Sequence, residues 1–315
     1  MLIVDRTEVL NAQVRIAGSV ERTPLVESVV DERKIWLKCE CLQTGGAFKL
    51  RGASNRLLQL SDEERARGVV AFSSGNHARG VAIAARRLGI RAVIVMPSDA
   101  PAVKIEGTRA EGAEIVLFDR YRESREEIAA RISADSGATV VPSFDDPHIV
   151  AGQGTVGLEI LEQMPADPQR IIVPCGGGGL AAGIALACPD AEIVIVEPEG
   201  WDDMRRSLEG GEIVSVSSNA PATLCDALQT PRVSPITFGI LQERAARAVS
   251  VSEDAVRKAI RWAWRRNQLT VEPGGSVALA ALLSGAVEPK DGTVIVLSGG
   301  NIDPALHAEI VSEED

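Results

Sequence analysis

Thr44-Gly45-Gly46-Ala47-Phe48-Lys49-Leu50-Arg51-Gly52-Ala53 is the stretch around which the rest of the chain can be understood. It holds a lysine, Lys49, between apolar Phe48 and Leu50. Glycines flank the lysine on both sides, and a residue without a side chain lets the backbone come close to a flat ligand. Removal from water lowers the pKa of a lysine amine and prepares it for imine formation with a carbonyl compound. An ordinary surface Lys-Arg pair at a helix start is the alternative for this stretch taken alone.

Length and composition indicate a protein with a large core and no polyanionic partner. The chain has 315 residues, of which 45% are hydrophobic, and this length suits two domains. Its net charge of −11 argues against nucleic acid or an anionic membrane surface as a partner. The chain contains no stretch of about 18 uncharged apolar residues, so a transmembrane helix is not expected. An odd number of cysteines, with no secretory leader and no zinc spacing, predicts free thiols in the cytoplasm; they are Cys39, Cys41, Cys175, Cys188 and Cys225.

Strand-like and helix-like segments alternate along most of the chain. We expect strands at 35–40, 68–72, 92–96, 114–118, 138–141, 170–174, 192–196 and 293–297. We expect helices at 5–17, from 49 to about 60, from a cap at residue 61, from the end of the 73–77 loop to 88, at about 101–111, at 122–135, at about 152–163, from the glycine loop at 176–179 to 187, and at 253–268. This order predicts an α/β fold in which helices cover both faces of parallel sheets. The irregular segment 142–147 interrupts the alternation. We therefore predict a large domain from residues 1–66 and 144–315, with a smaller α/β domain of residues 67–143 inserted in it.

A glycine loop, Cys175-Gly176-Gly177-Gly178-Gly179-Leu180, follows one expected strand and opens a helix. Consecutive backbone N–H groups at a helix N-terminus form a phosphate site. The loop lacks the Gly-Lys-Ser/Thr ending of a P-loop, and it is not the usual dinucleotide pattern of a first βα unit. A tight packing turn is one alternative. Because Glu197 follows about 20 residues later, like a ribose-binding acid, an NAD-binding oxidoreductase is another.

Two further polar loops end expected strands. Ser73-Ser74-Gly75-Asn76-His77 stands where open α/β sheets bind ligands, and its N–H groups, hydroxyls and amide suit a carboxylate. A simple helix N-cap is the alternative there. Ser298-Gly299-Gly300-Asn301 follows the last strand and offers a neutral hydroxyl to a heterocyclic nitrogen, with a plain turn as the alternative.

Taken together, these motifs resemble the fold type II pyridoxal-phosphate enzymes, in the serine/threonine dehydratase and serine racemase branch. The resemblance spans nearly the whole chain and includes Ala151-Gly152-Gln153-Gly154-Thr155 between the other motifs. It implies a tryptophan synthase β-like fold with a mobile small domain, a homodimer, and pyridoxal 5′-phosphate as cofactor. The chain ends at residue 315, so the regulatory C-terminal domain of biosynthetic threonine dehydratases is not expected.

The resemblance also implies roles for individual residues. Lys49 would form a Schiff base with the cofactor and later act as the base on the α-proton. Gly176, Gly177, Gly178, Gly179 and Leu180 would hold the phosphate, Asn76 the ring 3′-oxygen, Ser298 the pyridine nitrogen, and Phe48 would lie beside the cofactor. Ser73, Ser74, Asn76 and His77 would surround the substrate carboxylate. Ser74, on the face opposite Lys49, could also return a proton. Arg125 would reach an acidic ligand, although it also suits a solvated helix surface.

A cation site and a reaction follow from the same resemblance. Glu197, Asp203 and the carbonyl of Trp201 resemble a site for Mg or Ca, hard cations that prefer oxygen ligands; acids at a helix N-terminus are the alternative.

A serine facing the pyridine nitrogen makes the ring a weaker electron sink and favours prompt loss of a β-hydroxyl. We therefore predict a dehydratase that converts threonine or serine, or also 3-hydroxyaspartate, to a 2-oxo acid and ammonia. A serine or aspartate racemase on the same site is the alternative.

Overall fold

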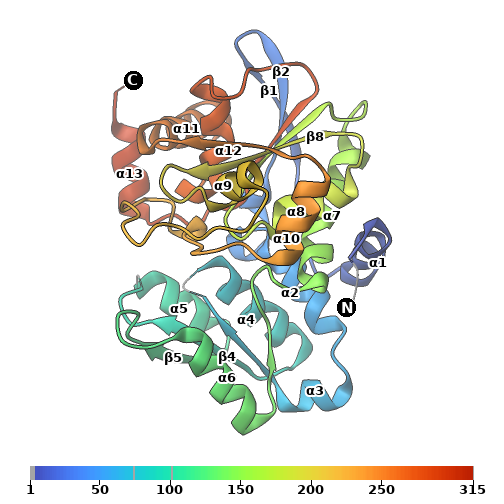
Figure 1. Ribbon diagram of the computed structural model, residues 1–315, viewed down its shortest axis with the longest axis vertical. Coiled ribbons are helices and arrows are strands. Elements are labelled where there is room, and N and C mark those ends of the chain that lie inside the picture. Colours follow the sequence, from blue (N-terminus) through green and yellow to red (C-terminus); the bar gives the residue numbers. More distant parts are fainter. Residues whose placement is uncertain (1–3, 74, 101, 315) are drawn as a thin grey trace.

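The structure is a computed structural model that describes residues 4–73, 75–100 and 102–314. Its strands form two separate sheets, which lie in the upper and lower halves of Figure 1. The larger sheet has the order β1-β2-β10-β7-β8-β9. Its strands are β1 (Leu25–Val30), β2 (Arg33–Lys38), β7 (Arg170–Pro174), β8 (Glu192–Pro198), β9 (Arg247–Val251) and β10 (Thr293–Val296). All neighbouring pairs in it are parallel except the β1–β2 hairpin.

Alternate residues of the larger sheet enter two different cores. Ile172 and Val194 pack with helices α11 (Glu253–Asn267), α12 (Pro273–Leu283) and α13 (Pro304–Ser312) on one face. Ile171 and Val173 pack on the other face with α1 (Arg6–Ile16), α7 (Pro147–Gln163), α8 (Gly179–Ala187) and α10 (Pro235–Glu243). Side chains of a strand alternate between faces, so continuous apolar strands are what a sheet covered on both sides requires.

The smaller sheet contains only strands from residues 69–140, in the order β5-β4-β3-β6 and all parallel. These are β3 (Val69–Phe72), β4 (Ala92–Pro97), β5 (Glu114–Phe118) and β6 (Thr139–Val140). Helix α4 (Asn76–Leu88) packs on one face together with α2 (Lys49–Leu58), and α6 (Arg125–Ser136) packs on the other. Helices α3 (Asp62–Arg67), α5 (Ala102–Ala110) and α9 (Asp203–Gly210) and the short helices η1 (Glu40–Leu42), η2 (Thr44–Gly46) and η3 (Asp226–Leu228) complete the described elements.

The predicted fold class is confirmed: two sheets, almost entirely parallel, with helices on both faces. Several elements differ from the prediction. Strand β1 was not expected, because Thr23-Pro24 indicated only a break; the chain turns back at Asp31 and Glu32, both with positive φ, to make a two-residue hairpin. Helix α7 begins at Pro147 rather than at residue 152, since Asp146 caps it by accepting from the backbone of His148 and Ile149. The domain boundaries and the mobility of the small domain stay predictions.

Two expectations from composition can be compared with the structure. All five cysteines are buried and free, as predicted. Over the described ranges, the helices lack the combination of length and apolar character that crossing a bilayer requires.

Candidate active site

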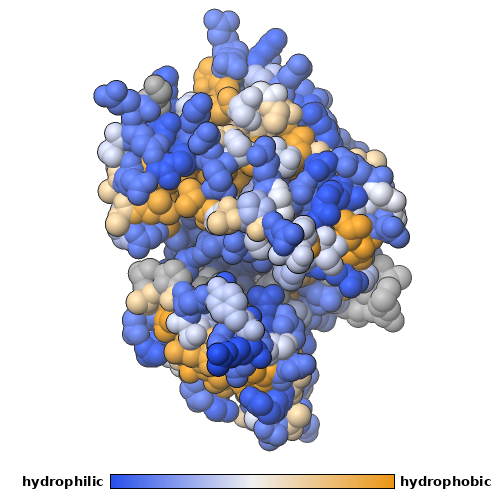
Figure 2. Space-filling view, turned by 60° about the vertical axis from the view of Figure 1, so that its left-hand side comes forward, coloured by the Kyte–Doolittle hydropathy of each residue, from blue (hydrophilic) through white to orange (hydrophobic). Residues whose placement is uncertain are grey.

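A cavity of about 420 Å³ lies between the two sheets and is lined by residues of both. In Figure 2 an indentation with largely hydrophilic walls separates the upper and lower parts of the molecule. The predicted loops meet there: Lys49, the start of α4, the glycine loop and Ser298 all line the cavity. Sheet topology explains this meeting, because the loops follow the carboxyl ends of parallel strands.

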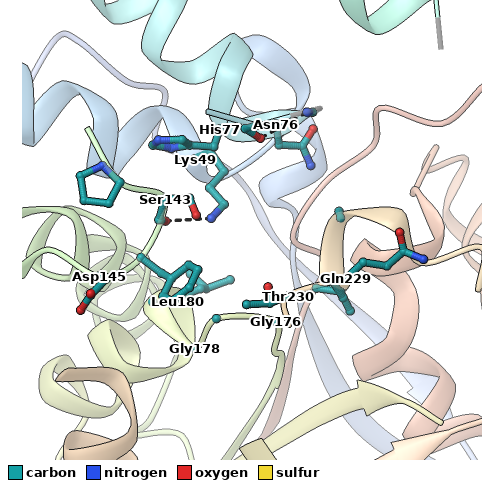
Figure 3. A pocket seen from close by; sticks show the side chains of 18 of the residues that line it. Lys49, Asn76, His77, Ser143, Asp145, Gly176, Gly178, Leu180, Gln229 and Thr230 are labelled. Carbon is teal, nitrogen blue, oxygen red and sulfur yellow. Dashed lines mark hydrogen bonds between the residues drawn. The ribbon is translucent and has the colours of Figure 1, made fainter. Parts of the chain in front are cut away.

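Lys49 is the first residue of α2, and its side chain extends into the cavity between Asn76 and His77 on one side and the glycine loop on the other (Figure 3). Its Nζ donates to the backbone oxygen of Ser143 at 3.0 Å and lies 5.1 Å from the centre of the Phe48 ring. Burial lowers the pKa of Lys49 to about 8. An amine with this pKa is partly neutral near neutral pH, which nucleophilic attack on a carbonyl carbon requires.

The glycine loop forms the opposite wall and begins α8. Gly178 caps the helix with φ of 85° and ψ of −2°, a left-handed conformation that favours glycine. A Cβ at Gly177 would lie 2.2 Å from the Phe144 ring. In the described part of the chain nothing accepts from the backbone N–H groups of residues 176 to 179. Leu180 continues the helix, is buried, and also lines the cavity. The wall is therefore a set of open backbone donors at a helix N-terminus, which suits a phosphate.

The start of α4 presents a second set of donors. Gly75 is the N-cap of α4, and no described residue accepts from the backbone N–H of Asn76 or His77. Ser73 Oγ accepts from Gly75 N at 3.3 Å. Ser74, predicted to be catalytic and substrate-binding, lies outside the described residues.

The His77 ring forms a hydrogen bond to the backbone and is not a donor to a substrate carboxylate. Its Nε2 lies 2.9 Å from the backbone oxygen of Val141, which can only accept, so Nε2 carries the hydrogen. Its Nδ1 is buried without a partner among the described residues. Burial, together with the charge of Lys49, lowers the pKa of His77 to about 3. The ring is therefore neutral, and only the backbone N–H of His77 remains to face an anion.

Ser298 is buried just after β10 and lines the cavity. Its backbone oxygen accepts from Phe48 N at 3.2 Å, which ties the last strand to the residue before Lys49. Arg125, at the first position of α6, also lines the cavity. Its Nε lies 2.8 Å from Glu126 Oε1, and its guanidinium lies over the Phe72 ring at 5.4 Å.

The predicted cation ligands are not among the residues that line this cavity; they lie between the end of β8 and the start of α9. Glu197 is buried and accepts from the backbone of Met204 and Arg205, while Asp203 Oδ2 accepts from Val233 N. Asp203 Oδ1 is buried and has no partner among the described residues. Burial raises the pKa of Glu197, and it raises that of Asp203 to about 7. Within the described ranges, no group of three or more His, Cys, Asp or Glu side chains forms a metal site; the main-chain carbonyl of Trp201 is the third ligand in the prediction.

Sequence reasoning missed several lining residues: Lys104, Ser143, Phe144, Asp226 and Glu272. Glu272 is the most unusual of them, because it is a buried carboxyl 2.5 Å from Asn76 Nδ2. Burial raises the pKa of Glu272 to about 7, and Asp226 adds to this effect. The only local signal was Glu272 followed by Pro273 at a helix start, which predicts a cap and not a cavity wall.

The chain is similar over nearly its whole length to known proteins. The family model "Pyridoxal-phosphate dependent enzyme" matches residues 16–299. The L-threo-3-hydroxyaspartate ammonia-lyase of Saccharomyces cerevisiae is 39% identical, over 100% of this chain and 98% of its own length. The structure of maize serine racemase has a TM-score of 0.91 at 37% identity, covering 98% of this chain and 97% of that one. The crystal structure of the T.th. threonine deaminase has a TM-score of 0.88 at 42% identity, with 95% and 99% coverage.

Proposed function

The chain belongs to the pyridoxal-phosphate dependent enzyme family, and on that premise we propose that it is a dehydratase of β-hydroxy L-amino acids. The products would be a 2-oxo acid and ammonia, and threonine, serine and 3-hydroxyaspartate are the candidate substrates. The observation that carries this proposal is the placement of Lys49, with its lowered pKa, across the cavity from the open donors of residues 176–179. The NAD-binding oxidoreductase considered for the glycine loop is set aside, because the family model includes that loop.

The residues present fit the cofactor of this family. A phosphate needs donors that face the cavity, and the backbone N–H groups of residues 176–179, which line it, have no acceptor among the described residues. Gly177 lets this loop pack directly on the Phe144 ring, where a side chain would overlap. When bound, pyridoxal phosphate supplies an electron sink for the α-carbon of an amino acid. We assign Lys49 Nζ as the covalent attachment point and afterwards as the group that takes the α-proton. Asn76 would donate to the ring oxygen and Ser298 to the ring nitrogen, with Phe48 alongside.

The substrate carboxylate would bind at the N-terminus of α4. The backbone N–H groups of Asn76 and His77 and the hydroxyl of Ser73 are the available donors there, and the positive end of the helix favours an anion. Ser74 belongs to the same proposed subsite. Arg125 would face a ligand with a second acidic group, provided that such a group replaces Glu126 as its partner.

A panel assay tests this function. The purified protein, loaded with pyridoxal phosphate, is incubated with L-threonine, L-serine and L-threo-3-hydroxyaspartate, and 2-oxo acid and ammonia are measured beside the chirality of the remaining amino acid. Release of 2-oxo acid supports the dehydratase. Accumulation of the D-enantiomer without 2-oxo acid would replace it with the racemase alternative, for which we assign Ser74 as the residue that returns the proton.

A divalent cation, Mg or Ca, is part of the proposal. Asp203 Oδ1 supports it, because a buried carboxylate oxygen without a partner suits a missing hard cation. The test is the thermal midpoint with and without added Mg: a metal-dependent rise that Asp203→Asn removes supports the site, and an equal response in both proteins contradicts it. The homodimer and the cytoplasmic location remain predictions from the sequence.

A further inference from the structure

Four polar side chains form one hydrogen-bonded row beside the cavity. Arg79 Nη1 donates to Asn301 Oδ1 at 3.2 Å. Asn301 Nδ2 donates to Asn76 Oδ1 at 2.7 Å and to the backbone oxygen of Gly45 at 2.8 Å. Asn76 Nδ2 donates to Glu272 Oε1 at 2.5 Å. The row joins α4, the loop after β10, the turn before Lys49 and the N-terminus of α12.

The direction of every hydrogen bond in this row is fixed from its ends. A guanidinium can only donate and a backbone oxygen can only accept, so Arg79 and Gly45 orient the Asn301 amide. That amide then presents N–H to Asn76, whose oxygen must accept. Asn76 Nδ2 consequently faces Glu272, where a carboxylate accepts it. Neither amide can turn over without placing two acceptors or two donors against each other.

Two glycines next to the row stand where any side chain would overlap it. A Cβ at Gly299 would lie 2.1 Å from Glu272 Oε1, and a Cβ at Gly46 would lie 2.3 Å from Asn301 Oδ1. Glu272 N also donates to Gly299 O at 2.9 Å. The two glycines therefore admit the carboxylate and the amide at contact distance.

We infer that Glu272 and Asn301 are positioning residues that hold the Asn76 amide so that its second N–H is offered to the cavity. Asn76 Nδ2 carries two hydrogens, and in the described part of the chain only Glu272 takes one of them. The free N–H would be the donor to the cofactor's ring oxygen, so the inference rests on the proposed function. Glu272 and Asn301 thus act through Asn76 and need not touch the substrate.

Two variants of Glu272 separate the effect of its negative charge from the effect of its hydrogen-bond acceptor. Glu272→Gln and Glu272→Leu both remove the negative charge, but only Gln keeps an oxygen that can accept from Asn76. The readout is the pH midpoint at which the visible absorption band of bound pyridoxal phosphate changes. A donated N–H withdraws charge from the ring oxygen and lowers the proton affinity of the lysine–cofactor linkage. Losing one hydrogen bond to a charged oxygen should raise the midpoint by about one pH unit.

We expect the midpoint of Glu272→Leu to lie about one pH unit above that of Glu272→Gln, and Asn301→Ala to lie about as far above wild type. Glu126→Gln is the control, because it removes a charge from the same cavity without touching the row, and its midpoint should stay near that of wild type. Circular dichroism of every variant checks folding. Equal midpoints for Glu272→Leu and Glu272→Gln, or an equal rise in Glu126→Gln, would overturn the inference. Absence of any Lys49-dependent band in the wild type would instead overturn the proposed function.

Discussion

Arg51, two residues after Lys49, is completely buried, and we predict that Arg51→Met destabilises the protein severely. Arg51 Nε and Nη2 donate to Glu40 at 2.8 and 2.9 Å, and Nη1 and Nη2 donate to Glu159 at 2.7 and 2.9 Å. Lys38 Nζ donates to Glu159 at 2.6 Å. Two cations and two anions therefore balance inside the core, directly behind the helix that begins with Lys49.

The expected loss of stability follows from the buried negative charge that the substitution leaves unbalanced. Methionine keeps much of the aliphatic stem but leaves Glu40 and Glu159 with Lys38 as their only cation in this group. Removing one partner of a buried ion pair costs about 3–5 kcal/mol, because the other charge stays buried and uncompensated. Arg91→Met is the matched control: Arg91 also makes two hydrogen bonds to one glutamate, Glu114, but both side chains are more than half exposed. An exposed pair contributes at most about 1 kcal/mol.

Urea unfolding measured by circular dichroism, at one fixed cofactor concentration, gives the free energy of unfolding of both variants. Burial alone would raise the pKa of Glu40, but Arg51, together with Lys38 and the Thr23 hydroxyl, holds it below the ordinary value. A lowered carboxyl pKa stabilises the fold above the unfolded-state value of about 4.3, and this stabilisation is lost as the pH falls further. The deficit of Arg51→Met should therefore be full at neutral pH and shrink in acid. A deficit no larger than that of Arg91→Met at neutral pH would refute the reasoning.

Three further outcomes concern the cavity. Lys49→Ala should abolish both the visible absorption band of the loaded protein and 2-oxo acid release, while binding of inorganic phosphate at the glycine loop persists. The rate at which the band appears in wild type should rise with pH through about 8, because only the neutral amine attacks and burial lowers the pKa of Lys49 to about 8. Stopped-flow absorbance measures this rate. A midpoint near the ordinary lysine pKa of about 10.4 would contradict the prediction. Gly177→Ala should weaken pyridoxal-phosphate affinity at least tenfold, because its Cβ would overlap Phe144. A tenfold loss corresponds to about 1.4 kcal/mol of strain. Gly210→Ala is the control: no atom lies within 4 Å of its Cβ, so it should bind the cofactor normally in the same titration.

Most strands of the fold could be predicted because their signals are local. A short apolar run such as Val69–Phe72, bounded by glycine and serine, predicts a buried strand wherever it stands. Strand β9 (Arg247–Val251) gave no such signal, since four of its five residues are partly or fully exposed at the sheet edge. Helix α12 was also missed, because Gly274 and Gly275 lower helix propensity; both glycines are buried, and a Cβ at Gly275 would lie 2.4 Å from Gly299 O. Packing overrides propensity at that helix.

Some residues of the candidate site could be predicted from neighbours in the sequence, and others depend on residues far away in the chain. The glycine loop and Lys49 are indicated by residues adjacent in sequence, whereas Glu272 is 196 positions from its partner Asn76. Nothing near Glu272 in the chain says that its carboxyl will be buried, or that a side chain from the other sheet will donate to it. A single sequence can supply the parts of such a site that a short loop creates by itself. The parts that depend on two sheets meeting are specified by the whole fold, which makes Glu272 and Asn301, rather than Lys49, the sharper test of whether this arrangement of the two sheets is the working one.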